Sequence, residues 1–285
     1  MESIPVRHLN VSQNEPDLSE AFSIRNIQSL LAGKDMVQEL HRHDFYYILV
    51  LTNASGSHHI DFTPYSIANH SVFFMRPGQV HQLVLNAESN GYLMQFRDEF
   101  YFPKDKASNQ LLRKASQINH YQLNEYSFQR LQAISAYISL EYKEKADRYE
   151  EVIKANMGIM FIQLTRHQGT APAEKASLYM QEKLEKFLEL LEANVITHKQ
   201  VAQYAKMLNL SAYQLNAIAK AALGKTCSEI INEHIVLEAK RCLLATSNQV
   251  NQTAYRLGYA DVSYFIRFFK KHTGYSPEAF RHNHK

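Results

Sequence analysis

Two stretches near the C-terminus repeat one pattern. Gln200–Ile231 reads QVAQYAKMLNLSAYQLNAIAKAALGKTCSEII, and Gln249–Phe280 reads QVNQTAYRLGYADVSYFIRFFKKHTGYSPEAF. Matching residues lie 49 positions apart before the central turn and 50 apart after it, so the second copy has one more residue in its turn. The aligned pairs are Ala205 with Ala254, Leu208 with Leu257, Leu215 with Phe265, Ile218 with Phe268, Lys220 with Lys270, and Gly224 with Gly274.

Each copy predicts a helix, a tight turn and a second helix. Gly258 can adopt the left-handed backbone that such a turn needs, and Asn209 stands at the matching place in the first copy. Ser211 and Asp261 follow as N-caps. Each second helix then has an apolar pair and a terminal glycine: Leu215, Ile218 and Gly224 in one copy, Phe265, Phe268 and Gly274 in the other. The turn residue, the N-cap and the apolar pair occur together in both copies, which favours two helix–turn–helix units over a helical bundle with an incidental repeat.

The second helix of such a unit enters the major groove of DNA, with its early residues facing base edges. The residues expected to face outward are Ala212, Tyr213, Asn216 and Ala217 in one copy, and Val262, Ser263, Tyr264 and Arg267 in the other. Arg267 suits guanine and Asn216 suits adenine. We predict base reading by Tyr213, Asn216, Ser263, Tyr264 and Arg267, and phosphate contacts by Lys220, Arg256, Lys270 and Lys271.

Charge is distributed unevenly along the chain. Residues 195–285 contain 12 Lys and Arg against 5 Asp and Glu, a net charge of +7. The remaining 194 residues contain 19 against 23, a net charge of −4. A basic C-terminal module on a mildly acidic body indicates a polyanionic partner for the module, although chance asymmetry is the simpler alternative.

Composition indicates a globular, two-domain chain of 285 residues. No apolar run is long enough to span a membrane, and the first residues, MESIPVRHLN, lack the apolar core of a signal peptide, so we expect a cytoplasmic protein. Cys227 and Cys242 are too few for a disulfide framework. The sequence has no Walker loop, G-x-S-x-G, Rossmann glycine pattern or C-x-x-C pair, and we expect no enzyme.

The first part of the chain, residues 1–105, has the pattern of a β-domain. Short aromatic and aliphatic runs at Phe45–Thr52, Ser71–Met75, His81–Leu85 and Gly91–Phe96 alternate with turn sequences. Their close spacing predicts a sandwich or small barrel.

Residues 106–167 have the pattern of a helical segment. Two apolar stripes predict helices that either cover the β-domain or form a subunit interface: Phe128, Leu131, Ile134 and Ile138, then Val152, Ile153, Met157, Met160, Phe161 and Leu164. We expect a linker over 168–180 and an all-helical domain over 181–285, which makes the fold class α+β.

The segment Leu243–Arg281, LLATSNQVNQTAYRLGYADVSYFIRFFKKHTGYSPEAFR, strongly resembles the C-terminal signature of AraC/XylS-type transcription regulators. The resemblance covers about residues 183–282. It implies two helix–turn–helix units joined by one long helix, here about Ser228–Thr246, that contact successive major-groove segments. The first copy departs from the family pattern, with Asn209 for the usual glycine and with Ala217 and Ala219 where Arg and Phe are usual. We therefore expect the second copy to supply most of the base reading.

The segments HRHDFYYILVL and MRPGQVHQL resemble the cupin-like sensor domain that often precedes this module. In metal cupins an H-x-H pair, a following Glu and a later His bind a divalent ion; here His41, His43 and His81 match, but Tyr47 stands near the place of the Glu. Imidazole suits first-row transition ions. We expect no cofactor and no metal, while leaving metal binding by these histidines open, and predict a ligand pocket lined by His41, His43, Tyr47, Phe74, Arg76 and His81.

The leading hypothesis is a dimeric transcription regulator, activator more often than repressor in the resembled family, that responds to a small molecule in its N-terminal barrel. Its partners would be double-stranded DNA, RNA polymerase and a second copy of the chain, and it would not bind a membrane. Two alternatives stay open: a metal-dependent cupin enzyme with a DNA-binding appendage, and a DNA-binding protein that responds to no ligand. The effector and the operator sequence are not encoded in any recognisable motif.

Overall fold

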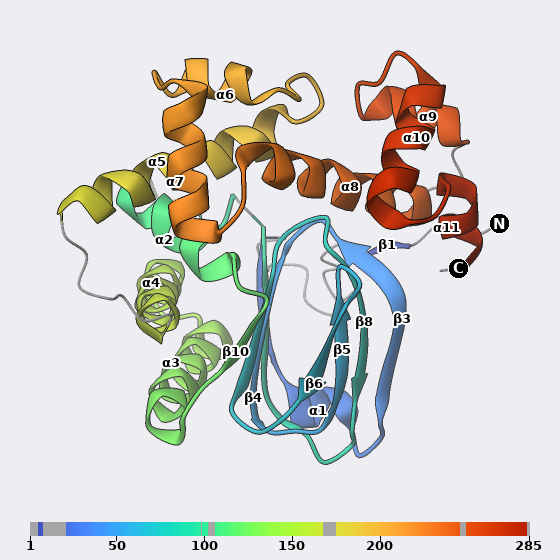
Figure 1. Cartoon of the computed structure of the whole chain (residues 1–285). Helices are drawn as coiled ribbons and strands as arrows, with labels where there is room; N and C mark the ends of the chain where they lie inside the picture. The colour runs from blue at the N-terminus through green and yellow to red at the C-terminus, as the bar shows by residue number, and fades with distance from the viewer. Residues whose placement is uncertain are drawn as a thin grey trace. The chain divides into compact units, whose positions relative to one another are not determined.

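The computed structural model describes residues 5–7, 21–97, 99–101, 106–167, 175–245 and 249–283. They form two compact units, one before and one after residue 170. Figure 1 shows strands in the first unit, whereas the second consists of helices and loops. The predicted α+β class is therefore confirmed. No helix in the described ranges is long and apolar enough to cross a membrane.

The N-terminal unit is built on two five-stranded sheets. The order in the first is β1 (Val6–Arg7), β3 (Met36–His43), β8 (Val80–Leu85), β5 (Gly56–Ile60) and β6 (Thr63–Ile67). The order in the second is β10 (His120–Gln122), β7 (Ser71–Met75), β4 (Tyr46–Asn53), β9 (Asn90–Phe96) and β2 (Phe22–Asn26). β1 pairs parallel with β3, and the other pairings in both sheets are antiparallel.

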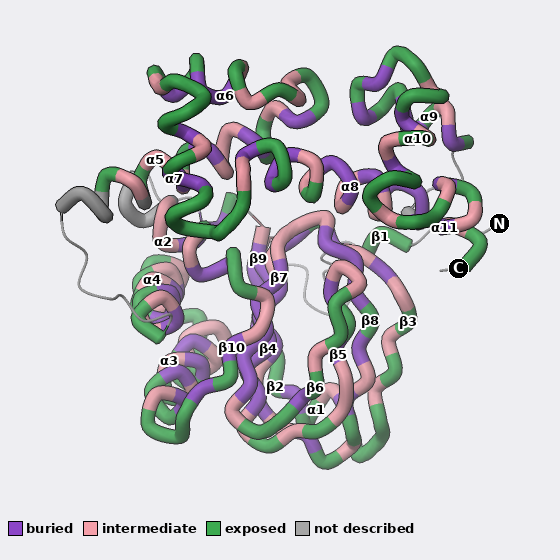
Figure 2. The backbone as a smooth tube through the Cα atoms, in the orientation of Figure 1, coloured by how far each residue is buried: buried purple, intermediate pink, exposed green. Residues whose placement is uncertain are grey.

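Strand β4 is buried on both faces, which explains its nearly continuous apolar sequence. Tyr47, Leu49 and Leu51 belong to one core cluster with residues of β5, β8 and the short helix α1 (Ile27–Leu31). Ile48 and Val50 point the other way, into a second cluster with helical residues. Figure 2 shows the buried backbone of β4 and the buried sides of the neighbouring helices.

Helices α2 (Lys106–Ser116), α3 (Glu125–Glu144) and α4 (Tyr149–His167) supply this second cluster. Phe161 of α4 is fully buried, and its ring lies 5.5 Å from that of Phe74 and 5.0 Å from that of Tyr101. Both predicted stripes therefore cover the β-domain. Each stripe has one partly buried member, Ile134 in α3 and Val152 in α4.

The sequence predictions locate β4, β7, β8 and β9 to within one residue at each end, but omit the other strands. β5 and β6 carry histidine, proline and serine in place of the usual strand formers. β10 lies inside the segment that we predicted to be helical. The predicted linker 168–180 lies partly outside the described residues, and helix α5 already begins at Lys175.

The C-terminal unit contains seven helices within its described residues. They are α5 (Lys175–Asn194), α6 (Val201–Met207), α7 (Ala212–Leu223), α8 (Cys227–Ala245), α9 (Val250–Arg256), α10 (Val262–Thr273) and α11 (Pro277–Asn283). The long α8 connects the α6–α7 pair to the α9–α10 pair, near the expected position of Ser228–Thr246. Cys227 and Cys242 are both buried free thiols on this helix.

Replacement of Phe161 by alanine is expected to destabilise the N-terminal unit by about 3–5 kcal/mol, because a buried ring is lost and a cavity remains. The matched control is Arg166→Ala, which removes an exposed side chain of the same helix. Urea denaturation followed by circular dichroism measures both free energies of unfolding. Equal stability of the two variants would show that α4 does not cover the sheet as described.

Candidate nucleic-acid interface and buried histidine cluster

The repeat is reproduced helix by helix. α6 and α9 each contain seven residues, and α7 and α10 each contain twelve. The first helix of each pair begins with the same contact, because the side-chain oxygen of Gln203 or Gln252 accepts a 2.9 Å hydrogen bond from the backbone amide of Gln200 or Gln249. The two copies therefore share local hydrogen bonding as well as sequence.

Both turns contain the predicted left-handed residue, with φ of 54° at Asn209 and 74° at Gly258. Ser211 caps α7 through a 3.1 Å hydrogen bond from the amide of Gln214, and Asp261 caps α10 through bonds from the amides of Ser263 and Tyr264. The predicted turn and cap residues are confirmed.

Gly258 is also needed for close packing. A Cβ atom at this position would overlap the carbonyl oxygen of Ile196, in the loop between α5 and α6. The Lys199 ammonium group donates a 2.6 Å hydrogen bond to the same carbonyl and lies 5.0 Å from the ring centre of Tyr259. The loop that leads into the first helix–turn–helix unit thus packs against the turn of the second.

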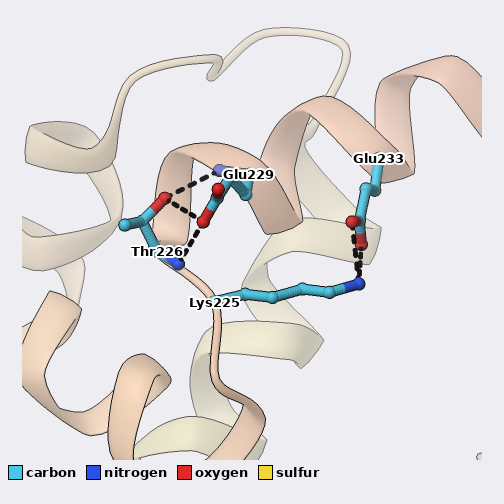
Figure 3. Close-up of polar contacts among 4 residues, drawn as sticks. All are labelled: Lys225, Thr226, Glu229 and Glu233. Carbon is cyan, nitrogen blue, oxygen red and sulfur yellow. Dashed lines mark hydrogen bonds and ion pairs between the residues drawn. The ribbon is translucent and has the colours of Figure 1, made fainter.

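Side chains that precede α8 bond to side chains within its first two turns and so stabilise its start (Figure 3). The Glu229 carboxylate accepts hydrogen bonds of 2.7 Å and 2.8 Å from the amide and hydroxyl of Thr226, and Thr226 accepts one from the amide of Glu229. Lys225 forms an ion pair with Glu233 one turn further on. The pattern Thr-x-x-Glu is the signal that predicts this capping box.

Asn216 has a role that the sequence did not predict. It is half-buried, and its side-chain oxygen accepts a 2.9 Å hydrogen bond from the amide of Cys227 at the start of α8. An adenine contact requires both the oxygen and the nitrogen of an asparagine amide. The Cys227 bond occupies one of the two lone pairs of the Asn216 oxygen, so the predicted adenine contact stays a prediction beside this structural role.

The other predicted DNA-facing residues are exposed or nearly so. Tyr213 is 84% exposed and Tyr264 is 55% exposed. Ser263 and Arg267 are exposed on α10, and all four predicted phosphate-contacting residues are exposed: Lys220, Arg256, Lys270 and Lys271.

One predicted stripe needs correction. The buried aromatic pair of α10 is Phe265 with Phe269, whereas Phe268 is only partly buried. The spacing of four places both rings on one helix face. In α7 the residue equivalent to Phe269 is Ala219, which is also buried.

The N-terminal unit gathers four histidines from three neighbouring strands. His41 and His43 are two residues apart on β3 and so point to the same face of the sheet. His81 of β8 pairs directly with His41, and His58 comes from the adjacent strand β5. All four side chains are buried. His58 is not among the residues that the sequence analysis assigned to the pocket.

The histidine rings are linked by short nitrogen–nitrogen distances. The Nε2 atoms of His41, His43 and His81 are separated by 3.2, 2.8 and 2.9 Å. His58 Nε2 lies 2.8 Å from His81 Nδ1, and His41 Nδ1 lies 2.7 Å from the carbonyl oxygen of Glu39.

Burial keeps this cluster uncharged. Desolvation lowers the pKa of His41 to about 4 and the pKa values of His43 and His58 to about 3, and it holds the pKa of His81 well below its ordinary value. Charges on neighbouring histidines and on Arg7 act in the same direction.

The predicted ligand-pocket residues separate into two groups. His41, His43, His81 and Tyr47 lie together, with the rings of His43 and Tyr47 stacked 5.4 Å apart. Phe74 was assigned wrongly, because alternation along β7 points it into the helix-facing cluster. Its neighbour Phe73 lies on the opposite side, 4.7 Å from the ring of His58.

Arg76 lies just beyond β7, at the turn before β8. Its backbone amide donates a 2.7 Å hydrogen bond to the side-chain oxygen of Gln79. Arg76 is partly buried. This burial does not test its predicted role in the ligand pocket, which stays a prediction.

Substitution of Gly258 by alanine is expected to destabilise the C-terminal unit by more than about 1–2 kcal/mol, the usual cost of left-handed backbone for an L-residue. The added methyl group must also displace the Ile196 carbonyl. Asn209→Gly, at the equivalent turn, serves as the matched variant and should leave stability unchanged or raised. Thermal unfolding measures both, and a harmless Gly258→Ala would contradict the packing described.

Acidification is expected to destabilise the N-terminal unit below about pH 6.5. The folded-state pKa values of the four histidines lie below the ordinary 6.5, so the unfolded chain takes up protons first. Stability that is complete above pH 6.5 is lost as the pH falls toward 4, by about 1.4 kcal/mol per pH unit for each imidazole.

Urea denaturation at pH values between 7 and 5 measures this slope. His58→Leu, which removes one buried imidazole, should give a shallower slope than the parent chain. A free energy of unfolding that does not change with pH over this range would show that these histidines are not held neutral by folding.

Two family models match the chain, one in each unit. The "AraC-like ligand binding domain" model matches residues 33–145, and the "Helix-turn-helix domain" model matches residues 204–283. The first match contains the histidine cluster, and the second contains both turns and both exposed helices.

Known proteins are similar over most of the chain. The HTH-type transcriptional activator RhaS of Citrobacter koseri is 24% identical over 246 residues, which cover 85% of this chain and 86% of that protein. RhaS of Yersinia pseudotuberculosis is 24% identical over 245 residues, with 85% and 88% covered. The crystal structure of ToxT from Vibrio cholerae is 13% identical with a TM-score of 0.45, covering 94% of this chain and 99% of that one. With a matching model in each unit, the chain belongs to the AraC-type family of transcription regulators.

Proposed function

We propose that this protein activates transcription by binding promoter DNA through α7 and α10, under the control of a small molecule bound in the N-terminal unit. The observation that carries the proposal is the double helix–turn–helix geometry, with equal helix lengths and left-handed turns in both copies. Activation is inferred from RhaS, whose name describes a transcriptional activator.

The two copies contribute unequally in this proposal. Arg267, Tyr264 and Ser263 of α10 read base edges, with Arg267 donating two hydrogen bonds to a guanine. α7 presents the exposed Tyr213 next to short alanines, while Asn216 is engaged with α8. The second copy therefore discriminates between sequences, and the first mainly holds the DNA.

Exposed cations near the ends of the helices supply the sequence-independent part of the affinity. Lys220, Arg256, Lys270 and Lys271 contact phosphates in this proposal, since their charged groups are exposed and the surrounding segment is basic. Phosphate neutralisation releases condensed counterions, so binding becomes salt-dependent.

Each segment of the chain has one role in this proposal. Residues 1–105 sense the ligand, 106–167 mediate dimerisation, 168–180 link the domains, and 181–285 bind DNA. Ligand acts by binding more tightly to the DNA-competent state than to the incompetent one. The active species is a cytoplasmic homodimer that contacts RNA polymerase and catalyses no reaction.

Dimerisation through the helical segment is supported by its exposed apolar side chains. Tyr137 and Leu140 on α3 are 46% and 47% exposed, and Ile159 and Ile162 on α4 are 47% and 37% exposed. Contiguous exposed apolar surface marks interaction sites, and we infer that these four side chains contribute to one.

Selection from random-sequence duplexes would first supply a high-affinity DNA site. Arg267→Ala is expected to weaken binding to that site roughly 5- to 150-fold, since a bidentate guanine contact contributes about 1–3 kcal/mol. Lys271→Ala should weaken binding to all sequences and reduce the salt slope by about 1. Fluorescence anisotropy at several salt concentrations measures both effects.

The control is Lys34→Ala, which removes an exposed lysine from the loop between α1 and β3 and should leave DNA binding unchanged. Salt-insensitive binding would contradict the proposed contacts, as would an Asn216→Ala variant that loses more affinity than Arg267→Ala while remaining folded.

A further inference from the structure

Lys199 connects the two helix–turn–helix units through its side chain. Its ammonium group donates a 2.6 Å hydrogen bond to the carbonyl oxygen of Ile196 and lies 3.5 Å from the carbonyl oxygen of Gly258. The same group stands 5.0 Å from the ring centre of Tyr259, within the range of a cation–π interaction. A side chain from the entry loop of the first unit therefore contacts two groups in the turn of the second unit.

The backbone of Lys199 is attached to helix α6 of the first unit. The side-chain oxygen of Gln203 accepts hydrogen bonds from the backbone amides of Lys199 and Gln200, at 3.0 Å and 2.9 Å. The hydroxyl of Tyr204, on the same helix, donates a 2.6 Å hydrogen bond to the carbonyl oxygen of His198. The position of Lys199 is therefore set by the first helix–turn–helix unit.

Tyr259 continues the contact into the exposed helix of the second unit. The tyrosine is buried, and its ring packs against three aromatic rings of α10. The centre-to-centre distances are 5.9 Å to Tyr264, 5.3 Å to Phe265 and 5.8 Å to Phe268. A continuous path of contacts thus runs from α6 through Lys199 and Tyr259 to the helix that carries most of the predicted base readers.

Gly258 leaves the space that this path needs. A Cβ atom at residue 258 would lie 2.8 Å from the ammonium nitrogen of Lys199 and 2.0 Å from the carbonyl oxygen of Ile196. Packing against the turn partly removes the ammonium group from water, and this desolvation lowers the pKa of Lys199. The second turn is therefore shaped to receive a lysine side chain from the first unit.

We propose that Lys199 is a positioning residue, which fixes the orientation of α10 relative to the first unit and so sets the spacing of the two DNA segments that the protein accepts. This role rests on the proposed DNA-binding function and adds to it. Helix α8 already joins the two units, and a second attachment through Lys199 restricts rotations that one attachment allows. The stiffness of a link between two binding modules determines how steeply affinity depends on the separation of their sites.

The first test requires no DNA. Spin labels on Ala221→Cys of α7 and Lys271→Cys of α10 report the distance between the two exposed helices by double electron–electron resonance on the full-length protein. Cys227 and Cys242 are buried, whereas both introduced thiols lie at exposed positions and react first. We expect a narrow distribution of distances in the parent chain and a broader one when Lys199→Met is added.

The matched control is Lys183→Met. Lys183 is also partly buried, and its ammonium group lies 3.4 Å from the carbonyl oxygen of Leu208 and 5.4 Å from the ring centre of Tyr179. These contacts involve α5 and the first unit alone, so their loss should leave the distribution narrow. Lys199→Arg keeps a donor and a positive charge, and it should retain part of the narrow distribution.

The second test measures affinity for duplexes with a changed spacing. The two segments of the selected site are moved apart in steps of one base pair, up to about five base pairs or half a helical turn. The parent chain should lose roughly 100-fold or more in affinity as the second segment leaves its register. Lys199→Met should bind the original duplex about 2- to 5-fold more weakly, as expected for a lost cation–π contact, and should discriminate less between spacings.

A duplex that contains only the second segment separates positioning from direct DNA contact. The parent chain and Lys199→Met should bind it equally and with the same dependence on salt, because Lys199 neutralises no phosphate in this proposal. Equal losses on every duplex, with a salt slope smaller by about 1, would overturn the proposal and make Lys199 a phosphate contact.

An unchanged distance distribution in folded Lys199→Met would also overturn the proposal. Circular dichroism checks the fold, and Lys199→Gln, which is polar but uncharged, takes the place of Lys199→Met if that variant does not fold. A parent chain that selects no DNA site would contradict the proposed function, and the distance measurement would then decide the role of Lys199 by itself.

Discussion

The contact between Gly258 and the Ile196 carbonyl is the constraint on which the DNA-binding unit depends. The turn of the second copy can approach the entry loop of the first only because residue 258 has no side chain. Lys199 bridges the same place through its hydrogen bond to Ile196. This contact adds to the covalent connection through α8, so the two exposed helices are held by two links. A fixed separation is what two readers of one DNA duplex require.

In the N-terminal unit, strand β4 lies between two apolar cores. One face packs against the helices and the other against the interior that contains the histidines. A shift of β4 by one residue would exchange the two faces, so the register of this strand positions the sensor interior and the helical layer together. Desolvation in this interior lowers the pKa values of the histidines, which keeps their rings uncharged.

The sequence predicted the parts of the structure that are governed by local chemistry. Asn209, Gly258, Ser211 and Asp261 have roles set by backbone conformation and capping, and all four appear as expected. Differences arose where the outcome depends on packing: Phe74 faces the helical layer and not the histidines, and Asn216 has an additional bond to a helix that begins eleven residues later. His58 joins the cluster through strand pairing, which no local pattern encodes.

In the proposed complex, two similar helix–turn–helix units bind one face of DNA, and the second reads most of the sequence. Hydroxyl-radical footprinting of the full-length protein on its selected site tests this directly. We expect two protected segments on one face, with centres about one helical turn, or roughly 10–10.5 base pairs, apart. Interference by base modification should be stronger in one segment than in the other. A single protected segment would show that only one of the two units contacts DNA.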